Sequence, residues 1–196
     1  DVDRHATLLS KKDDSMEGKL AERLFEARTV LIHGEIHSAL AERIVGQLLA
    51  LSATSDARID VYVHSQGGHV ESGDTIHDVI RFIKPRVRMI GTGWVASAGT
   101  HIYLAAPKED RFCLPNTRFL IHQPAGGIGG QAVDIGIEAE ELIKMRRRLN
   151  EVIAKQTGLP IERVEEDTQR NYWMSPGQAL EYGIVGKIVG SIDELG

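Results

Sequence analysis

Ser97 is the residue of this sequence best suited to nucleophilic chemistry. It lies in the run GWVASAGT, residues 93–100, where a predicted strand gives way to a predicted helix. Gly93 and Gly99 allow backbone and ligand to approach closely, and a helix starting here directs free N–H groups toward developing negative charge. The alternative is a structural serine at a helix start. The run is not G-x-S-x-G, so it does not indicate an α/β-hydrolase.

A serine nucleophile needs a neighbouring base, and His122 is the leading candidate among eight histidines. It follows the apolar run RFLI at the end of a predicted strand. The alternative for His122 is a hydrogen-bonded histidine of the core. His101 is a rival because it lies four residues after Ser97 on the same helix face. A base one turn further along that helix would sit away from an approaching substrate, so His122 ranks first.

An oxyanion needs hydrogen-bond donors, and two backbone groups are candidates. Gly67 and Gly68 follow a predicted strand, and the N–H of Ala98 begins the helix after Ser97. Glycine pairs are common in turns, so this pair alone is weak evidence for an oxyanion-binding site. The sequence has no H-E-x-x-H, no cysteine pair and no phosphate-binding G-x-x-x-x-G-K-[ST] loop. We therefore expect no metal and no cofactor, and any use of ATP would belong to a partner.

The scaffold for these residues is predicted to alternate strands with helices, which indicates an α/β fold with a largely parallel sheet and crossover helices. Parallel sheets carry ligands beyond the carboxyl ends of their strands, where both Gly67–Gly68 and Ser97 fall. The predicted strands are 29–33, 59–65, 86–93, 111–114 and 118–121, and the predicted helices are 18–27, 38–51, 72–84, 96–106, 131–157, 161–170 and 178–182.

Length and composition narrow the class of protein. The 196 residues allow one domain with a sizeable core; we assign it to 18–196, after a flexible segment 1–17. A net charge of −5 argues against nucleic acid as the main partner. No run is apolar and long enough to span a membrane. The single cysteine excludes an internal disulfide, which fits a reducing compartment, and we expect a cytoplasmic location.

The stretch 131–157 predicts a helix roughly 40 Å long, more than one small core needs. Ile135, Leu142 and Leu149 are among its apolar positions, and glutamates and arginines occupy the other face. Two interpretations remain open from the residues alone. The helix is either a solvated surface helix with paired charges or a projecting helix that packs against another subunit.

Four blocks of this sequence, in this order, resemble the proteolytic subunit of the Clp (caseinolytic) protease. They are HSQGGHVESGDTIHDVIRFIKP, GTGWVASAGTHIYLAAP, RFCLPNTRFLIHQPAGGIGGQAVDI and MSPGQALEYGIVGKI. The resemblance extends from about residue 18 to 193. It implies a crotonase-like α/β fold and a serine endopeptidase that acts on unfolded polypeptides inside a chamber of seven-fold rings. It also implies an AAA+ ATPase of the Clp type as partner. The segment 123–158 corresponds to the "handle" that joins two rings, and the resemblance leaves open whether the rings are homo- or hetero-oligomeric.

The resemblance assigns roles to residues by position. Ser97 matches the nucleophile, His122 the general base, and Gly68 and Ala98 the oxyanion donors, with alanine at a position where methionine is usual. Because a backbone N–H makes the contact, that change is tolerated.

Asn171 departs from the pattern, because the third catalytic residue of the family is an aspartate. An aspartate holds the imidazole tautomer and stabilises the imidazolium, whereas an asparagine brings no charge. The exchange costs about 10⁴ in rate in a serine protease, so we expect weak activity from this chain alone. Asp167, one helical turn earlier, is a possible substitute.

A second departure concerns the hydrophobic pocket where the family receives a loop of its ATPase. The matching positions are Tyr62, Phe82, Ile90, Phe112 and Leu114. Asp60 and Thr92 stand where an aromatic residue and a methionine are expected. An unpaired carboxylate against an apolar loop costs free energy, so Asp60 predicts impaired docking. Trp94 and His69, beside the predicted site, differ from the residues usual in the family. They either shape the specificity pocket or are neutral changes.

Two rival functions remain open. One is a non-catalytic structural or regulatory subunit of a mixed Clp complex, in which a more orthodox ring supplies the activity. The other is an acyl-CoA enzyme on the related crotonase fold, where paired backbone N–H groups hold a thioester oxygen. The pairing of Ser97 with His122 and the handle-like helix argue against the second.

Overall fold

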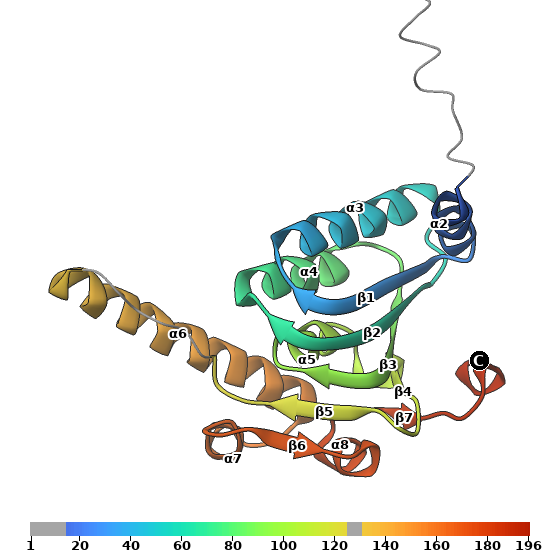
Figure 1. The fold of residues 1–196 in the computed structure, drawn as a ribbon. Coiled ribbons are helices and arrows are strands. Elements are labelled where there is room, and N and C mark those ends of the chain that lie inside the picture. Colours follow the sequence, from blue (N-terminus) through green and yellow to red (C-terminus); the bar gives the residue numbers. More distant parts are fainter. Residues whose placement is uncertain (1–14, 125–130) are drawn as a thin grey trace, which may run out of the picture.

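The computed structural model describes residues 15–124 and 131–196. Within them the strands form one sheet in the order β1-β2-β3-β4-β7, with β5 beside β3 and β6 beside β5 (Figure 1). All pairings are parallel except β5 with β6. The strands are β1 (Thr29–Ile36), β2 (Ile59–Gly68), β3 (Val87–Ala96), β4 (Arg111–Cys113), β5 (Arg118–Ile121), β6 (Tyr172–Met174) and β7 (Lys187–Ile188).

Helices connect these strands, so the predicted α/β fold class is confirmed. The α-helices are α2 (Met16–Glu26), α3 (Ser38–Thr54), α4 (Val70–Phe82), α5 (Ala98–Tyr103), α6 (Ala132–Thr157), α7 (Ile161–Asp167) and α8 (Pro176–Tyr182). Two 3₁₀ turns, η1 (Lys108–Asp110) and η2 (Ile192–Leu195), complete the described elements. In the described part of the chain, no helix combines the length and apolarity that crossing a bilayer requires.

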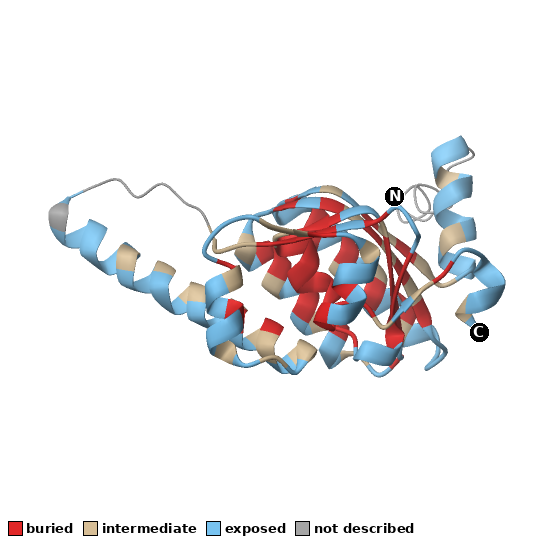
Figure 2. Ribbon diagram, turned by 90° about the horizontal axis from the view of Figure 1, so that it is seen from below, coloured by how far each residue is buried: buried red, intermediate tan, exposed pale blue. Residues whose placement is uncertain are grey.

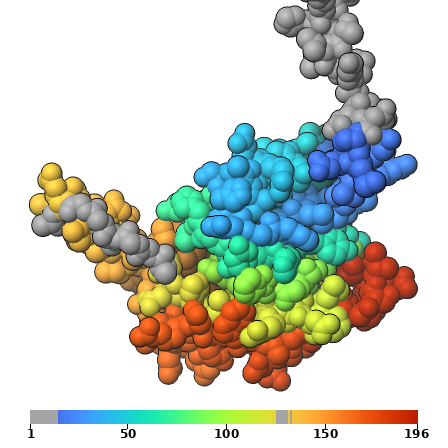
Figure 3. All heavy atoms as spheres, viewed as in Figure 1, coloured from blue at the N-terminus to red at the C-terminus, as the bar shows by residue number. Residues whose placement is uncertain are grey.

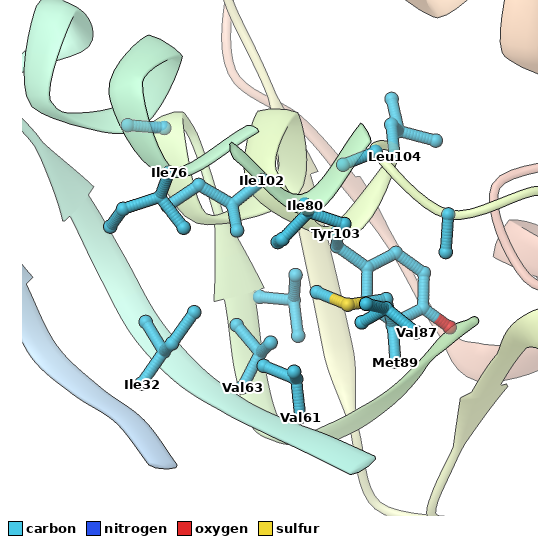
Figure 4. Packing of buried hydrophobic residues seen from close by; sticks show 14 of the residues in the cluster. Ile32, Val61, Val63, Ile76, Ile80, Val87, Met89, Ile102, Tyr103 and Leu104 are labelled. Carbon is cyan, nitrogen blue, oxygen red and sulfur yellow. The ribbon is translucent and has the colours of Figure 1, made fainter. Parts of the chain in front are cut away.

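The core lies between the sheet and helices α3, α4 and α5. Alternate residues of β2 are buried, among them Val61 and Val63, because successive side chains of a strand point to opposite faces. Ile76 and Ile80 of α4 are one turn apart and face the sheet, and Tyr103 of α5 packs beside them (Figure 4). Figure 2 shows that the buried residues concentrate in this layer. The core thereby fixes the carboxyl ends of β2 and β3, where the candidate site lies.

The structure corrects several predicted boundaries. β2 and β3 reach Gly68 and Ala96, beyond the predicted ends at 65 and 93. β2 continues because its last residues pair with β1, and β3 continues because its last residues pair with β5 after an irregularity in the β2–β3 register. The helix predicted at 96–106 is only α5, Ala98–Tyr103. β6 and β7 were not predicted, since two or three residues carry no measurable alternation.

The predicted flexible segment 1–17 falls mostly outside the described residues. Its last two residues, Met16 and Glu17, belong to α2 instead. The reason is Ser15, whose side-chain oxygen accepts a hydrogen bond from the N–H of Gly18 at 3.0 Å and so starts the helix early.

Helix α6 projects from the body of the molecule (Figure 1). Its last turns are anchored by Asn150 and Ile153, which are buried. Its outer turns leave large apolar side chains in solvent, with Val133 74% exposed and Ile143 67% exposed, and Figure 2 shows this part as mostly exposed. Residues 125–130 of the predicted 123–158 handle lie outside the described residues. A helix with unpartnered apolar residues favours contact with another chain over a purely solvated surface.

Candidate active site

Ser97 lies at the turn between β3 and α5. Its φ of 56° and ψ of −121° are rare for a residue with a side chain, and such a conformation costs of order 1–3 kcal/mol unless the surroundings impose it. The surroundings here are well defined: the N–H of Ser97 donates to the carbonyl of Leu120 at 3.0 Å. The hydroxyl of Thr100 contacts the carbonyls of Val95 and Leu120 at 2.8 and 2.9 Å. The strained turn is therefore held by both neighbouring strands.

His122 meets Ser97 directly. Its Nε2 is 2.8 Å from the Ser97 Oγ. The parallel pairing of β3 with β5 explains the meeting, because Ala96 lies opposite Leu120 and both chains continue past the sheet edge together. The two residues predicted as nucleophile and base are thus brought within hydrogen-bond distance.

Asn171 reaches the other side of His122 through the antiparallel pair β5–β6. In that register Ile121 lies opposite Tyr172, so the next residues outward, His122 and Asn171, are neighbours. A side-chain hydrogen bond joins them. Gln123 fixes the same loop, since its backbone N–H donates to the carbonyl of Thr168 at 2.7 Å. Because Nε2 faces Ser97, the imidazole nitrogen left for Asn171 is Nδ1.

The pKa of His122 depends on its burial and on Asn171. Burial lowers the pKa of His122 below its ordinary value, and the hydrogen bond with Asn171 opposes that shift only in part. No carboxylate contributes to its pKa. The imidazole is therefore kept neutral near pH 7, as a general base must be, but its protonated form has no stabilising charge beside it.

Gly67 and Gly68 are the last two residues of β2, and Gly67 packs against the nucleophile. Their φ angles are +96° and +148°, which residues with side chains rarely adopt. A Cβ on Gly67 would lie 2.5 Å from the Ser97 Cβ, and one on Gly68 would collide with the carbonyl of Ile36. Ala98 is the first residue of α5, so its N–H has no acceptor within the helix. The backbone of two elements thus flanks Ser97, with Gly67 of β2 on one side and Ala98 of α5 next to it in the chain. The N–H of Gly67 itself donates to the Ser65 hydroxyl at 3.0 Å.

The contact between Gly67 and Ser97 makes a testable prediction. Replacing Gly67 with alanine should destabilise the fold by about 1–3 kcal/mol and slow covalent labelling of Ser97 by a fluorophosphonate, because the new methyl group displaces the Ser97 side chain. Urea unfolding and the labelling rate measure the two effects. Gly46→Ala is the matched control: it lies in α3 with nothing within 4 Å of the added Cβ, and should stabilise by about 0.5–1 kcal/mol. Equal labelling rates in the two variants would contradict the proposed close contact.

A partly enclosed hollow opens beside the Ser97–His122 pair. Its lining residues are Val70, Ser97, Ala98, Thr100, His101, Ile121, His122, Pro124, Leu149 and Ile153. Most of them are apolar, so the hollow suits an uncharged side chain of a bound peptide.

His101 lines this hollow but is engaged elsewhere. Its Nε2 lies 2.9 Å from Asp74 Oδ1, and its ring stacks on His77 with centroids 4.4 Å apart. Arg148 of α6 binds both oxygens of Asp74 at 2.7 Å. Burial alone would raise the pKa of Asp74, but the contacts with His101 and Arg148 outweigh it and lower the pKa. His101 thus joins α5 to α4 and α6, and His122 is the histidine that faces the nucleophile.

Three other residues singled out in the sequence have side chains that contact partners other than Ser97 and His122. Asp167 is not a substitute for Asn171, since its Oδ2 accepts from Arg163 at 2.7 Å and from Tyr182 at 3.0 Å. Trp94 stacks on Trp173, with ring centroids 6.0 Å apart. His69 is bound to its own helix start, through Ser72 and Glu71. Neither Trp94 nor His69 lines the hollow.

The predicted partner-binding residues separate into two groups. Ile90 and Phe112 are buried together with Val189, and Tyr62 and Leu195 pack against them. We call Tyr62, Ile90, Phe112 and Val189 the docking cluster. The other two predicted residues, Phe82 and Leu114, are exposed and are not part of it.

Asp60 beside this cluster is paired, contrary to the prediction of an unpaired carboxylate. It accepts from Arg88 Nε at 2.9 Å and from Arg88 Nη2 at 2.6 Å, and Arg58 lies 3.4 Å away. The parallel register of β2 and β3 places Asp60 opposite Arg88, which accounts for the pair. The carboxylate therefore does not impose the cost that the sequence suggested.

Among the residues that the structure describes, no three histidine, cysteine, aspartate or glutamate side chains converge as metal ligands. The groups that the site brings together are a serine hydroxyl, an imidazole and backbone N–H groups, and this combination suits acyl transfer.

Residues 12–191 match the family described as Clp protease. The chain is 57% identical over 175 residues to ATP-dependent Clp protease proteolytic subunit 3 of Rhizobium etli, covering 89% of this chain and 90% of the relative. It is 57% identical over 188 residues to proteolytic subunit 2 of Gluconobacter oxydans, covering 95% and 84%. The solved structure of ClpP1 from Listeria monocytogenes is similar with a TM-score of 0.83 and 53% identity, covering 90% of this chain and 99% of that one.

Proposed function

The chain belongs to the Clp protease family, and from that premise we propose that it cleaves peptide bonds as a serine-type endopeptidase. Its relatives are named as proteolytic subunits of the ATP-dependent Clp protease, so proteolysis is the activity of the family. The observation that supports the serine type is the 2.8 Å contact between Ser97 Oγ and His122 Nε2 at a strained turn that begins a helix.

The first chemical step follows from these positions. The Ser97 hydroxyl donates its proton to His122 Nε2 while its oxygen attacks the scissile carbonyl carbon. The N–H groups of Gly68 and Ala98 hold the oxyanion that forms. His122 then returns the proton to the leaving amine as the C–N bond breaks, and water repeats the sequence to release the acyl group.

Asn171 sets the tautomer of His122. Attack by Ser97 requires an unprotonated Nε2, so the ring proton must be on Nδ1. The Asn171 carbonyl oxygen accepts from Nδ1–H and supports this tautomer, whereas its amide N–H₂ would support the opposite one. Neither orientation supplies a negative charge for the imidazolium, so the chain alone is a slow enzyme.

Assembly and energy supply are the wider part of the proposal. Helix α6, with its exposed apolar side chains, joins two seven-fold rings of the same or a related chain, and the catalytic sites face an enclosed chamber. A Clp-type ATPase unfolds the substrate polypeptide and hydrolyses the ATP, so this chain itself binds no nucleotide. The serine mechanism also uses no metal. We place the complex in the cytoplasm, without nucleic acid or membrane as a partner.

The ATPase is proposed to bind at the docking cluster and at Phe82 and Leu114. Phe82 is 84% exposed at the end of α4, and such a large exposed aromatic residue suits a protein contact. The pairing of Asp60 with Arg88 supports docking here, because the carboxylate remains compensated when an apolar loop approaches.

A fluorophosphonate probe tests the serine assignment. The assembled protein should be labelled at Ser97, as located by peptide mass spectrometry, because only an activated serine reacts with this probe. Ser97→Ala should remove the label. If Ser97 stays unlabelled even when mixed with an active partner ring, the chain is instead a non-catalytic subunit of a mixed complex.

A further inference from the structure

The segment Gly190–Gly196 folds back onto the body of the protein as a compact turn. The side chain of Glu194 accepts from the backbone N–H groups of Gly190 and Ser191, each at 2.9 Å, and Ser191 caps η2 in return. Lys187 donates to the carbonyl of Glu194 at 3.0 Å. The segment is therefore a defined structure, and we refer to it as the strap.

Leu195 is the residue that the strap inserts into the docking cluster. It packs against the cluster formed by Ile90, Phe112 and Val189, beside Tyr62. Ile192 on the same turn is 73% exposed and makes no such contact. The strap therefore presents one aliphatic side chain to the cluster, in the manner of a bound peptide.

Arginines hold the backbone of the strap at the same place. Arg88 Nη1 donates to the carbonyls of Leu195 at 2.6 Å and Gly196 at 3.3 Å, and Arg58 Nη2 donates to the carbonyl of Gly196 at 3.0 Å. Arg88 is only 4% exposed and lies 5.8 Å from the centre of the Phe112 ring. Asp60 fixes the Arg88 guanidinium from the other side. The site thus recognises an apolar side chain and the carbonyls that follow it.

The position of the strap is opposite to α6. In Figures 1 and 2 the end of the chain marked C and the projecting helix lie at opposite ends of the molecule. Figure 3 shows the last residues (red) against the side of the body away from α6. If α6 joins two rings, the strap lies on the surface that faces outward, where a second protein can approach.

We propose that the strap is an intramolecular competitor that occupies the docking cluster and must leave before a partner binds there. This inference rests on the proposed docking function of the cluster. It also defines the partner: a peptide loop with an aliphatic side chain in the place of Leu195 and free backbone carbonyls for Arg88 and Arg58. Docking on this subunit is then governed by the opening of its own strap.

The test compares Leu195→Ser with Ile192→Ser in the assembled protein. Hydrogen exchange of the backbone amides in residues 190–196 reports strap release, and biolayer interferometry measures the Kd of an immobilised Clp-type ATPase from the same organism. Leu195→Ser should accelerate the exchange and lower the Kd about tenfold, equal to about 1.4 kcal/mol. Ile192→Ser should change neither, because Ile192 is the same kind of residue without the contact.

The possible results distinguish a failure of the competition by the strap from a failure of ATPase docking at the cluster. Faster exchange with an unchanged, measurable Kd would overturn the competition while leaving docking intact, and so would equal effects of both variants. If the ATPase binds no variant although Ser97 is still labelled, docking at this cluster is wrong, and the competition is overturned with it. Only a lower Kd confined to Leu195→Ser supports the strap as a competitor.

Discussion

Replacing Asn171 with aspartate should raise kcat of the assembled protein by up to about 10⁴-fold, the inverse of the loss that the opposite exchange causes in a serine protease. The reason is local. A carboxylate at this position can only accept a hydrogen bond from Nδ1–H of His122, whereas an amide can also donate one. It would also stabilise the imidazolium that forms when Ser97 attacks. A fluorogenic peptide assay, with the oligomer mass checked in solution, measures the effect.

The pH profile of Asn171→Asp shows whether the increase in kcat comes from an interaction of the new carboxylate with His122. His122 works as a base only when neutral, so activity is lost as the pH falls through its pKa. With Asn171 that pKa lies below the ordinary value, which is about 6.5. The aspartate should raise the pKa, so the rising limb of kcat/KM moves to higher pH. Asn116→Asp, an exposed exchange of the same kind between β4 and β5, should move neither the limb nor kcat. An unchanged kcat for Asn171→Asp in correctly assembled rings would show that another step limits the enzyme.

Replacing Ser97 with alanine should have an effect that depends on residue 171. In an enzyme of this type, removing the serine costs about 10⁶ in kcat, whereas removing the aspartate alone costs about 10⁴, because the catalytic residues act as a unit. The chain as it stands, with Asn171, should therefore lose only about 10²-fold on Ser97→Ala. In the Asn171→Asp background the same exchange should cost about 10⁶-fold.

A four-way comparison of the two single variants, the double variant and the unaltered protein measures this coupling. Ser52→Ala on α3 controls for the loss of a hydroxyl elsewhere. If Ser97→Ala costs the same factor in both backgrounds, residues 97 and 171 do not act through one imidazole, and the assignment of Asn171 is wrong.

The sequence predicted the elements that carry a long enough pattern. The alternation in β2 and the helical spacing in α3, α4 and α6 are properties of many consecutive residues, so single-chain periodicity finds them. The short strands β6 and β7 have no such pattern, and they form only because β5 and β4 offer them backbone partners. Element ends also moved, as at Ser15, where a single side-chain hydrogen bond starts α2 early.

Residue types and local context were sufficient to single out Ser97 and His122, because a nucleophile and a base have recognisable surroundings at strand ends. Their contact and the position of Asn171 depended on tertiary structure, since they require the β3–β5 and β5–β6 registers. The same holds for Asp60, which looked unpaired because its partner Arg88 is distant in the chain and opposite in the sheet. Neighbouring residues in the sequence indicate the chemical role of a side chain. The pairing of side chains on different strands depends on the strand register, which only the folded sheet fixes.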